Sequence, residues 1–249
     1  LLPGQPPMHP DHALLRADIR AVLAALVLVA PGIARADNAA VDKIYHPYVQ
    51  PLEREFELRA VAEQGRAGAN SQRWRLGYGQ ALTSSFFAEL YVLGEDTGGD
   101  RSENSAYELE GLWQLTEQGE YAADWGVLFE LEKERHDNLW EFSTALLAER
   151  EWGRWVGTAN AHLIREWGDA VADEWETRLG LQARYRLSPL WEPAVEFHAA
   201  EDLRALGPAL LGTARLGGRR KLHWEAGLFA GLDADSPDLS VRGQLEYEF

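Results

Sequence analysis

The stretch Trp175–Leu187, WETRLGLQARYRL, alternates between apolar and polar side chains over most of its length. Leu179 and Leu181 are typical of one set of positions, and Arg178 and Arg184 of the other. Successive residues of a β-strand point to opposite faces, so this alternation predicts a strand with one apolar face and one polar face.

The same alternation recurs on both sides of this stretch. Four further segments are equally regular: Leu52–Ala62, Tyr107–Thr116, Tyr121–Glu132 and Leu239–Phe249. Seven segments are weaker: Arg73–Thr83, Phe86–Gly94, Leu139–Arg150, Trp155–Arg165, Trp191–Ala200, Gly207–Leu216 and Leu222–Leu232. Their lengths are close to the ~9–11 residues that a tilted membrane strand requires. We expect no helix after residue 40.

The links between these segments alternate in length. Ser188–Leu190 is a short link, whereas Gln64–Gln72 and Glu95–Ser105 are longer and polar. Short turns at one end and longer loops at the other are typical of outer-membrane barrels. The sequence therefore predicts an all-β fold, a single antiparallel up-and-down transmembrane β-barrel of about 12 strands. An even number of strands places both termini on the short-turn, periplasmic side.

Alternation alone does not decide which face meets lipid, since a soluble secreted sandwich or a lipocalin-like barrel also alternates. Three observations favour a membrane. Charge is nearly absent from the apolar positions, and all 10 Trp fall on them. Phe249 is in phase with the apolar face of a last strand, as in the C-terminal signature of bacterial outer-membrane proteins. We expect these aromatic side chains at the membrane interface: Trp74, Trp140, Trp155, Trp175, Trp191, Trp224 and Phe249.

Composition excludes several function classes. Lys and Arg number 24 against 40 Asp and Glu, a formal net charge of −16, so nucleic acid is not an expected partner. The chain has no Cys, which excludes disulfides, thiol catalysis and thiolate-held metals. No cofactor is expected. The expected partners are outer-membrane lipid, a small-molecule solute, and the barrel assembly machinery through Phe249.

The N-terminal region has the pattern of a secretory signal. The only Met is Met8, so residues 1–7 are expected to lie upstream of the true start. An apolar core at residues 21–30 is followed by Ala34-Arg35-Ala36, which matches the small-x-small cleavage rule. We therefore expect a signal peptide over residues 1–36, a periplasmic lead-in over 37–51, and the barrel over 52–249.

The polar positions predict the lining of the lumen, and acids outnumber bases on them. The candidate lining residues are Glu53, Glu55, Glu57, Arg59, Glu108, Glu110, Glu130, Glu132, Glu174, Glu176, Arg178, Arg184, Arg186, Glu196, Arg242 and Glu246. An acidic lumen of intermediate width favours a channel or transporter for small cationic or neutral solutes. The alternative is a structural or partner-binding barrel whose lumen is closed by Arg–Glu networks. A lipid-modifying enzyme is the third interpretation.

The sequence gives only weak indications of a metal site or a catalytic site. His162 and His198 share the polar parity on neighbouring hairpins, with Glu174 and Glu176 on the segment between them, which makes the two histidines weak metal candidates. No catalytic residue is expected, because no Ser or His occupies the lipid-facing parity of a strand centre and no G-x-S-x-G motif is present. The protein is therefore not expected to be an enzyme.

A short motif adds a resemblance. The run Lys43–Val49, KIYHPYV, followed by Glu53–Glu57, EREFE, is similar to the opening of uncharacterised proteobacterial outer-membrane barrels. These are loosely grouped with transporter-like barrels of aromatic-degradation pathways. The resemblance implies a location and an architecture, and it carries over no catalytic role.

Overall fold

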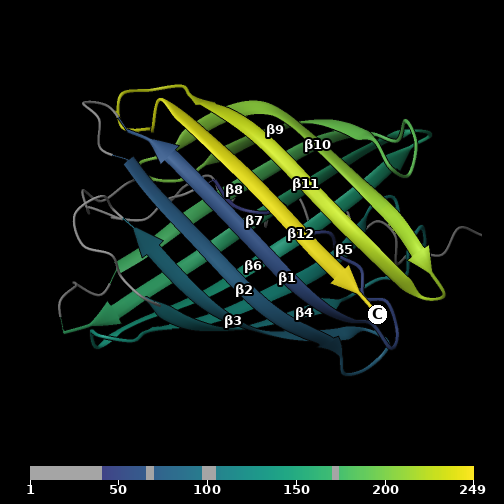
Figure 1. Ribbon diagram of the computed structural model, residues 1–249, viewed down its shortest axis with the longest axis horizontal. Helices are drawn as coiled ribbons and strands as arrows, with labels where there is room; N and C mark the ends of the chain where they lie inside the picture. Colours follow the sequence, from purple (N-terminus) through teal and green to yellow (C-terminus); the bar gives the residue numbers. More distant parts are fainter. Residues whose placement is uncertain (1–40, 66–69, 97–104, 170–173) are drawn as a thin grey trace, which may run out of the picture. The chain divides into compact units, whose positions relative to one another are not determined.

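The structure, a computed structural model, describes residues 41–65, 70–96, 105–169 and 174–249. The expected signal peptide and residues 37–40 lie outside the described residues. Twelve strands pair antiparallel, each with its sequence neighbours, and β1 pairs with β12 to close the barrel (Figure 1). The strands are β1 Arg54–Gln64, β2 Asn70–Ala81, β3 Phe86–Asp96, β4 Ala106–Gln114, β5 Asp124–Glu134, β6 Leu139–Trp152, β7 Trp155–Gly168, β8 Glu174–Tyr185, β9 Glu192–Ala199, β10 Arg204–Gly217, β11 Arg220–Gly231 and β12 Leu239–Glu248.

The predicted fold class and all twelve predicted strands are confirmed, with ends that differ by a few residues. β2 begins at Asn70, three residues before the expected start, because Asn70 pairs with Gln64 and extends the ladder to β1. In the part of the chain that the structure describes, no helix is long and apolar enough to cross a membrane.

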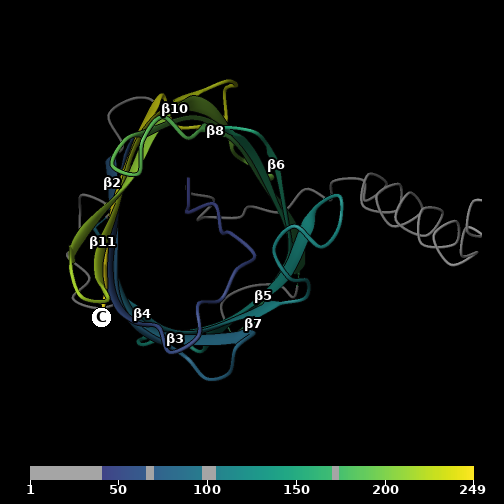
Figure 2. The same cartoon turned by 90° about the vertical axis from the view of Figure 1, so that its right-hand side faces the viewer.

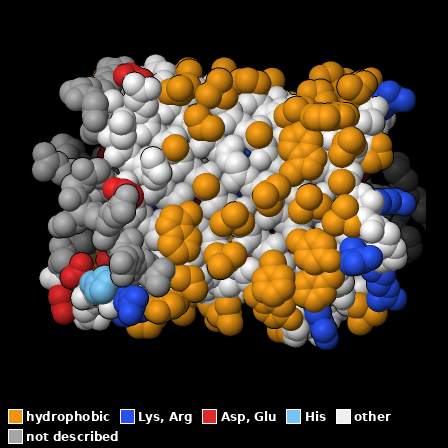
Figure 3. Space-filling model, in the orientation of Figure 1, with side chains coloured by type: hydrophobic (Ala, Val, Ile, Leu, Met, Phe, Trp, Pro, Cys, Tyr) orange, Lys and Arg blue, Asp and Glu red, His pale blue; other side chains and the backbone are white. Residues whose placement is uncertain are grey.

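The two faces of the wall have opposite polarity. On β1, Leu58 is 47% exposed on the outside, whereas its neighbour Glu57 is 0% exposed on the inside. Figure 3 shows apolar side chains spread over the outer face of the barrel, with Lys and Arg gathered at the right-hand end. A barrel that is apolar outside and polar inside has the arrangement of a transmembrane barrel, the reverse of a soluble one.

The predicted interface aromatics lie on this outer face. Trp140 and Trp224 are half-buried because each contacts a second indole, Trp167 at 6.4 Å and Trp191 at 5.2 Å between ring centroids. The other members are exposed: Trp74, Trp155, Trp175, Trp191 and Phe249. Aromatic side chains that cluster in this way can hold their rings in lipid and their N–H groups at its surface.

The described part of the expected periplasmic lead-in lies inside the barrel. Residues 41–49, which we call the lumen segment, run within the ring of strands (Figure 2). A turn at Gln50–Glu53, with Leu52 at a φ of 70°, then leads the chain into β1. The structure differs here from the expectation for residues 37–51. The physical reason is that the segment finds partners for both its charged and its apolar side chains within the lumen.

Candidate functional site

Hydrogen bonds from three strands hold the lumen segment in place. The Tyr45 backbone N–H donates to Asn160 Oδ1 (2.6 Å), and Asn160 Nδ2 donates to the Tyr45 carbonyl (2.9 Å). The Tyr45 hydroxyl donates to Glu110 (2.7 Å), and the Tyr48 hydroxyl donates to Asp124 (2.7 Å). These bonds satisfy backbone and side-chain groups that would otherwise be buried without partners.

Apolar side chains of the segment pack on the inner wall. Val41 belongs to a buried cluster with Leu203, Leu211 and Phe229, and Tyr45 packs with Leu128 and Leu147. Two inward glycines leave the space that the segment fills. A Cβ at Gly180 would lie 3.3 Å from Ile44 Cγ1, and a Cβ at Gly126 would lie 3.0 Å from Pro47 Cβ. Larger side chains at these two positions would press on the segment.

Asp42 lies among guanidinium groups. It forms an ion pair with Arg59, and its carboxylate lies 3.6 Å from Arg75 and 4.0 Å from Arg178. Arg242 donates to its backbone carbonyl. Burial opposes ionisation of Asp42, but Arg59, Arg75 and Arg178 hold its pKa well below the usual value. These ion pairs therefore persist until the pH falls well below the usual carboxylate range.

Lys43 provides the complementary charge. Its Nζ lies 2.7 Å from Glu57 and 3.5 Å from Glu246. Burial alone would lower the pKa of Lys43, but Glu57 and Glu246 raise it well above the usual value. The ammonium is thus charged throughout the physiological range. His46 adds a contact on the other side of the segment, where its Nδ1 meets Glu149.

In the structure, the sixteen predicted lining residues lie at the alternate positions whose side chains face the lumen. Eight are more than nine-tenths buried: Glu55, Glu57, Arg59, Glu108, Glu110, Glu130, Glu196 and Arg242. The other eight are half-buried: Glu53, Glu132, Glu174, Glu176, Arg178, Arg184, Arg186 and Glu246.

Some of these residues form ion pairs inside the lumen. Arg242 lies 2.8 Å from Glu196 and 3.3 Å from Glu225, and all three side chains are largely buried. Arg184 lies 2.9 Å from Glu192 nearer the end of the barrel. Buried pairs of this kind stabilise the barrel only as long as both partners are present.

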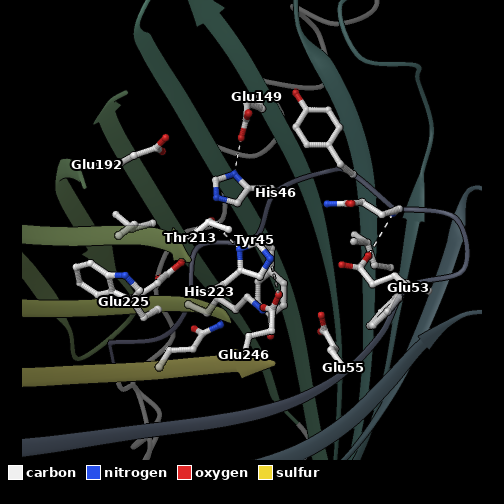
Figure 4. Close-up of a pocket in the computed structure, with 18 of the residues that line it drawn as sticks. Tyr45, His46, Glu53, Glu55, Glu149, Glu192, Thr213, His223, Glu225 and Glu246 are labelled. Atoms are coloured by element: carbon white, nitrogen blue, oxygen red, sulfur yellow. Dashed lines mark hydrogen bonds and ion pairs between the residues drawn. The ribbon is translucent and has the colours of Figure 1, made fainter. Parts of the chain in front are cut away.

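Cavities remain on either side of the lumen segment. One of about 330 Å³ opens at the end where β1 begins and β12 ends, and Figure 4 shows its acidic lining, which includes Glu53, Glu55 and Glu246. A second of about 110 Å³ lies towards the long-loop end, where Glu132 and Arg178 line it. Lys43, Tyr45 and His46 of the segment line the first cavity, and Arg75 and Arg178, which surround Asp42, line the second.

The structure does not assemble the suggested metal site. His162 pairs in register with Arg178, and His198 with Gly180, so neither lies level with Glu174 or Glu176. His162 lies 3.7 Å from Glu130 instead, and His198 lies 3.1 Å from Glu196. Among the described residues, the groups of side chains close enough to share a metal ion contain carboxylates alone. The two histidines are partners of buried acids.

Ser143, His162 and Glu130 meet in the lumen, but not as a catalytic relay. The Ser143 hydroxyl donates directly to Glu130 (2.5 Å). The imidazole approaches both groups through the same nitrogen, Nδ1, at 3.4 Å from Ser143 and 3.7 Å from Glu130. In a catalytic relay the histidine uses one nitrogen for the nucleophile and the other for the acid. This arrangement does not favour the lipid-modifying interpretation.

The sequence analysis did not identify the residues that fix the lumen segment. Asp42, Lys43, Tyr45 and His46 fell in the expected lead-in, and Asn160 was not among the candidate lining residues. One feature of the sequence could have indicated them. Acids outnumber bases at the positions that face the lumen, and buried carboxylates need cations, which other parts of the chain can supply.

Comparisons with known proteins agree on the fold. No family model matches the chain, and no curated protein matches its sequence. The structure is similar to the COG4313 outer membrane channel from Pseudomonas putida F1, with 14% identity, a TM-score of 0.56, and coverage of 84% of this chain and 99% of that chain. It is also similar to the KdgM porin in complex with disordered oligogalacturonate, with 10% identity, a TM-score of 0.53, and coverage of 78% and 98%. At these identities the likeness shows the fold alone.

Proposed function

We propose that this protein is an outer-membrane channel that passes small cationic or neutral solutes through an acidic lumen, and that the lumen segment closes it. The observation that carries the proposal is a closed barrel, apolar outside and acidic inside, whose lumen is occupied by residues 41–49. The similar solved structures are named as a channel and a porin, which supports a transport role.

The proposal also includes an orientation of the barrel in the membrane. The short turns, the start of β1 and the end of β12 lie at one end of the barrel, which we assign to the periplasm. In this orientation the cavity of about 330 Å³ faces the periplasm. Recognition of Phe249 by the assembly machinery, a proteobacterial origin and a relation to aromatic-degradation barrels stay predictions.

Selectivity in planar bilayers tests the proposal. We expect the purified protein to show discrete conductance steps with cations favoured over anions, because carboxylates line the lumen. Glu246→Gln, at the lining of the cavity of about 330 Å³, should lower the cation preference, measured as a shift in reversal potential under a salt gradient. Glu117→Gln, in an exposed turn at the same end, is the matched control and should leave it unchanged. A preference for anions, or the absence of any conductance, would count against the proposal.

The cation preference should also depend on pH. Burial, with the neighbouring carboxylates Glu248 and Glu246, raises the pKa of Glu53 to about 7. Glu53 therefore loses its proton between pH 6 and pH 8, which adds a negative charge to the cavity and increases the preference for cations. Reversal potentials recorded at the two pH values should differ in the wild-type protein, and the difference should be smaller in Glu53→Gln. An equal pH response in the two proteins would assign the titration to another group.

The second candidate is a structural barrel whose lumen stays closed. The observation that favours it is the fully buried Arg242, paired with Glu196 and bonded to the backbone of Asp42. Such a barrel would fold and insert normally, and its bilayers would stay silent even after the lumen segment is released. Conductance of segment-releasing variants therefore separates the two candidates.

A further inference from the structure

We propose that the acidic cluster beside Lys43 is a binding site for the protonated amine of a solute, and that Lys43 competes with the solute for it. The cluster consists of Glu53, Glu55, Glu57, Glu89 and Glu246, and we call it the amine site. This inference rests on the proposed function, because solutes reach the site only if they enter the lumen.

The first observation is that an ammonium group already occupies the site. Lys43 Nζ lies 2.7 Å from Glu57 and 3.5 Å from Glu246, and 5.2 Å from the ring centroid of Tyr45. An ammonium has three N–H donors and no acceptor, so carboxylate oxygens beside an aromatic face match it well. The chain thus shows which chemical group the cluster accepts.

The second observation is that the site holds more carboxyl groups than Lys43 pairs with. Glu55 is 5% exposed and Glu89 is 2% exposed. Neither forms an ion pair with a cation in the part of the chain that the structure describes. Oxygens of Glu53, Glu55 and Glu246 lie within 4.8 Å of one another, as do those of Glu55, Glu57 and Glu89. Because Glu55 belongs to both groups, the two form one continuous acidic surface.

The third observation is access. Glu53, Glu55, Glu89 and Glu246 all line the cavity of about 330 Å³, and Figure 4 shows Glu55 and Glu246 directed into it. The cavity also has an apolar side, formed in part by Phe87 and Leu112. This volume lies at the lower end of the usual range for small-molecule pockets. The ligand class that fits is a primary amine with a small apolar body.

An ammonium explains the cluster better than a divalent cation does. A divalent ion would need carboxylates that Lys43 already neutralises, and Lys43 would repel it at short range. Lys43 is tethered, so its effective concentration at the site is high, in the millimolar range or above for a short tether. A tethered competitor weakens the apparent affinity for any free amine. Removal of the competitor should therefore strengthen amine binding.

The test is calorimetric titration of the full chain in detergent with benzylamine, and with benzyl alcohol as the uncharged probe of the same shape. We expect Lys43→Gln to bind benzylamine about tenfold more tightly than the wild-type protein. Lys43→Arg keeps the tethered charge and should bind as weakly as the wild type. Glu246→Gln in the Lys43→Gln background should lose the gain, and Lys133→Gln, at the other end of the barrel, should have no effect. Benzyl alcohol should not bind to any variant.

Three results would overturn the inference. Lys43→Gln could bind benzylamine no more tightly than the wild type, benzyl alcohol could bind as well as benzylamine, or Mg²⁺ could displace benzylamine at equal concentration. The heat-dependent gel mobility of each variant confirms that the barrel is folded before titration. A barrel that conducts cations without these amine effects would refute the amine site alone. If the variants bind benzylamine as expected but the protein shows no conductance in bilayers, the channel is refuted and the amine site stands.

Discussion

Tyr45→Ala should open the lumen and raise the conductance of the barrel. Tyr45 is buried against Leu128, Ala145 and Leu147, and its hydroxyl donates to Glu110. Truncation of a buried aromatic side chain typically costs ~3–5 kcal/mol, and here the loss falls on the docking of the lumen segment. A loss of this size shifts the ratio of docked to released segment by roughly two to four powers of ten.

Single-channel recording checks this expectation through the fraction of time that the barrel conducts. Tyr45→Phe keeps the packing and loses only one hydrogen bond, so it should open far less. Tyr107→Ala removes an exposed tyrosine from the outer face of β4 and should not change conduction. Tyr45→Ala with wild-type open times, in a barrel that is shown to be folded, would mean that the segment does not close the lumen.

Arg242→Met should lower the free energy of unfolding by about 3–5 kcal/mol, because it leaves Glu196 buried without its main cation. Arg242 is 0% exposed, and it pairs with Glu196 at 2.8 Å and Glu225 at 3.3 Å. Arg204→Met is the matched control. Arg204 also forms a short ion pair, 2.6 Å from Asp233, but its side chain is 56% exposed, so its loss should cost only about 0–1 kcal/mol.

Denaturant unfolding of the barrel in detergent, followed by tryptophan fluorescence, measures both changes. Equal losses for Arg242→Met and Arg204→Met would show that water screens the centre of the lumen as it screens the surface. In that case the ion pairs would contribute little to closure, and the interior would be wetter than the buried side chains indicate.

The barrel could be predicted from the sequence because its signal is local and repeats. A period of two assigns every second side chain of a strand to one face, whatever the strand pairs with. That rule put Glu57 and Leu58 on opposite faces, and the charge-poor, Trp-rich apolar positions then placed Leu58 and Trp175 outside. Only the strand ends shifted, since the ladders extend beyond the alternating residues, as at Asn70.

The lumen segment could not be predicted in this way, because its conformation depends on partners distant in sequence. Tyr45 is held by Asn160, 115 residues away, and Arg242 bonds to Asp42 from 200 residues away. Residues 41–49 have no strand period, and Pro47 interrupts any regular element. Inward glycines in the middle of strands, Gly126 and Gly180, were a signal that another piece of backbone approaches the wall.

The histidine pair shows the same limit on a smaller scale. The alternation of side chains along each strand correctly placed His162 and His198 inside the lumen. Their level along the barrel depends on the register between strands, which parity does not fix. The register puts His162 opposite Arg178 and His198 opposite Gly180, so their carboxylate partners are Glu130 and Glu196.

A reversible cross-link between the lumen segment and the wall tests most directly whether the segment closes the channel. The chain has no Cys, so Ile44→Cys with Gly180→Cys introduces its only two thiols. A Cβ at Gly180 would lie 3.3 Å from Ile44 Cγ1, which brings the two Cβ atoms near the spacing that a disulfide requires. Mass spectrometry verifies the bond, and each single-Cys variant controls for effects of the oxidant. We predict that the oxidised double variant does not conduct and that reduction restores discrete, cation-preferring steps. Equal conductance of the oxidised and reduced forms would contradict closure of the lumen by residues 41–49.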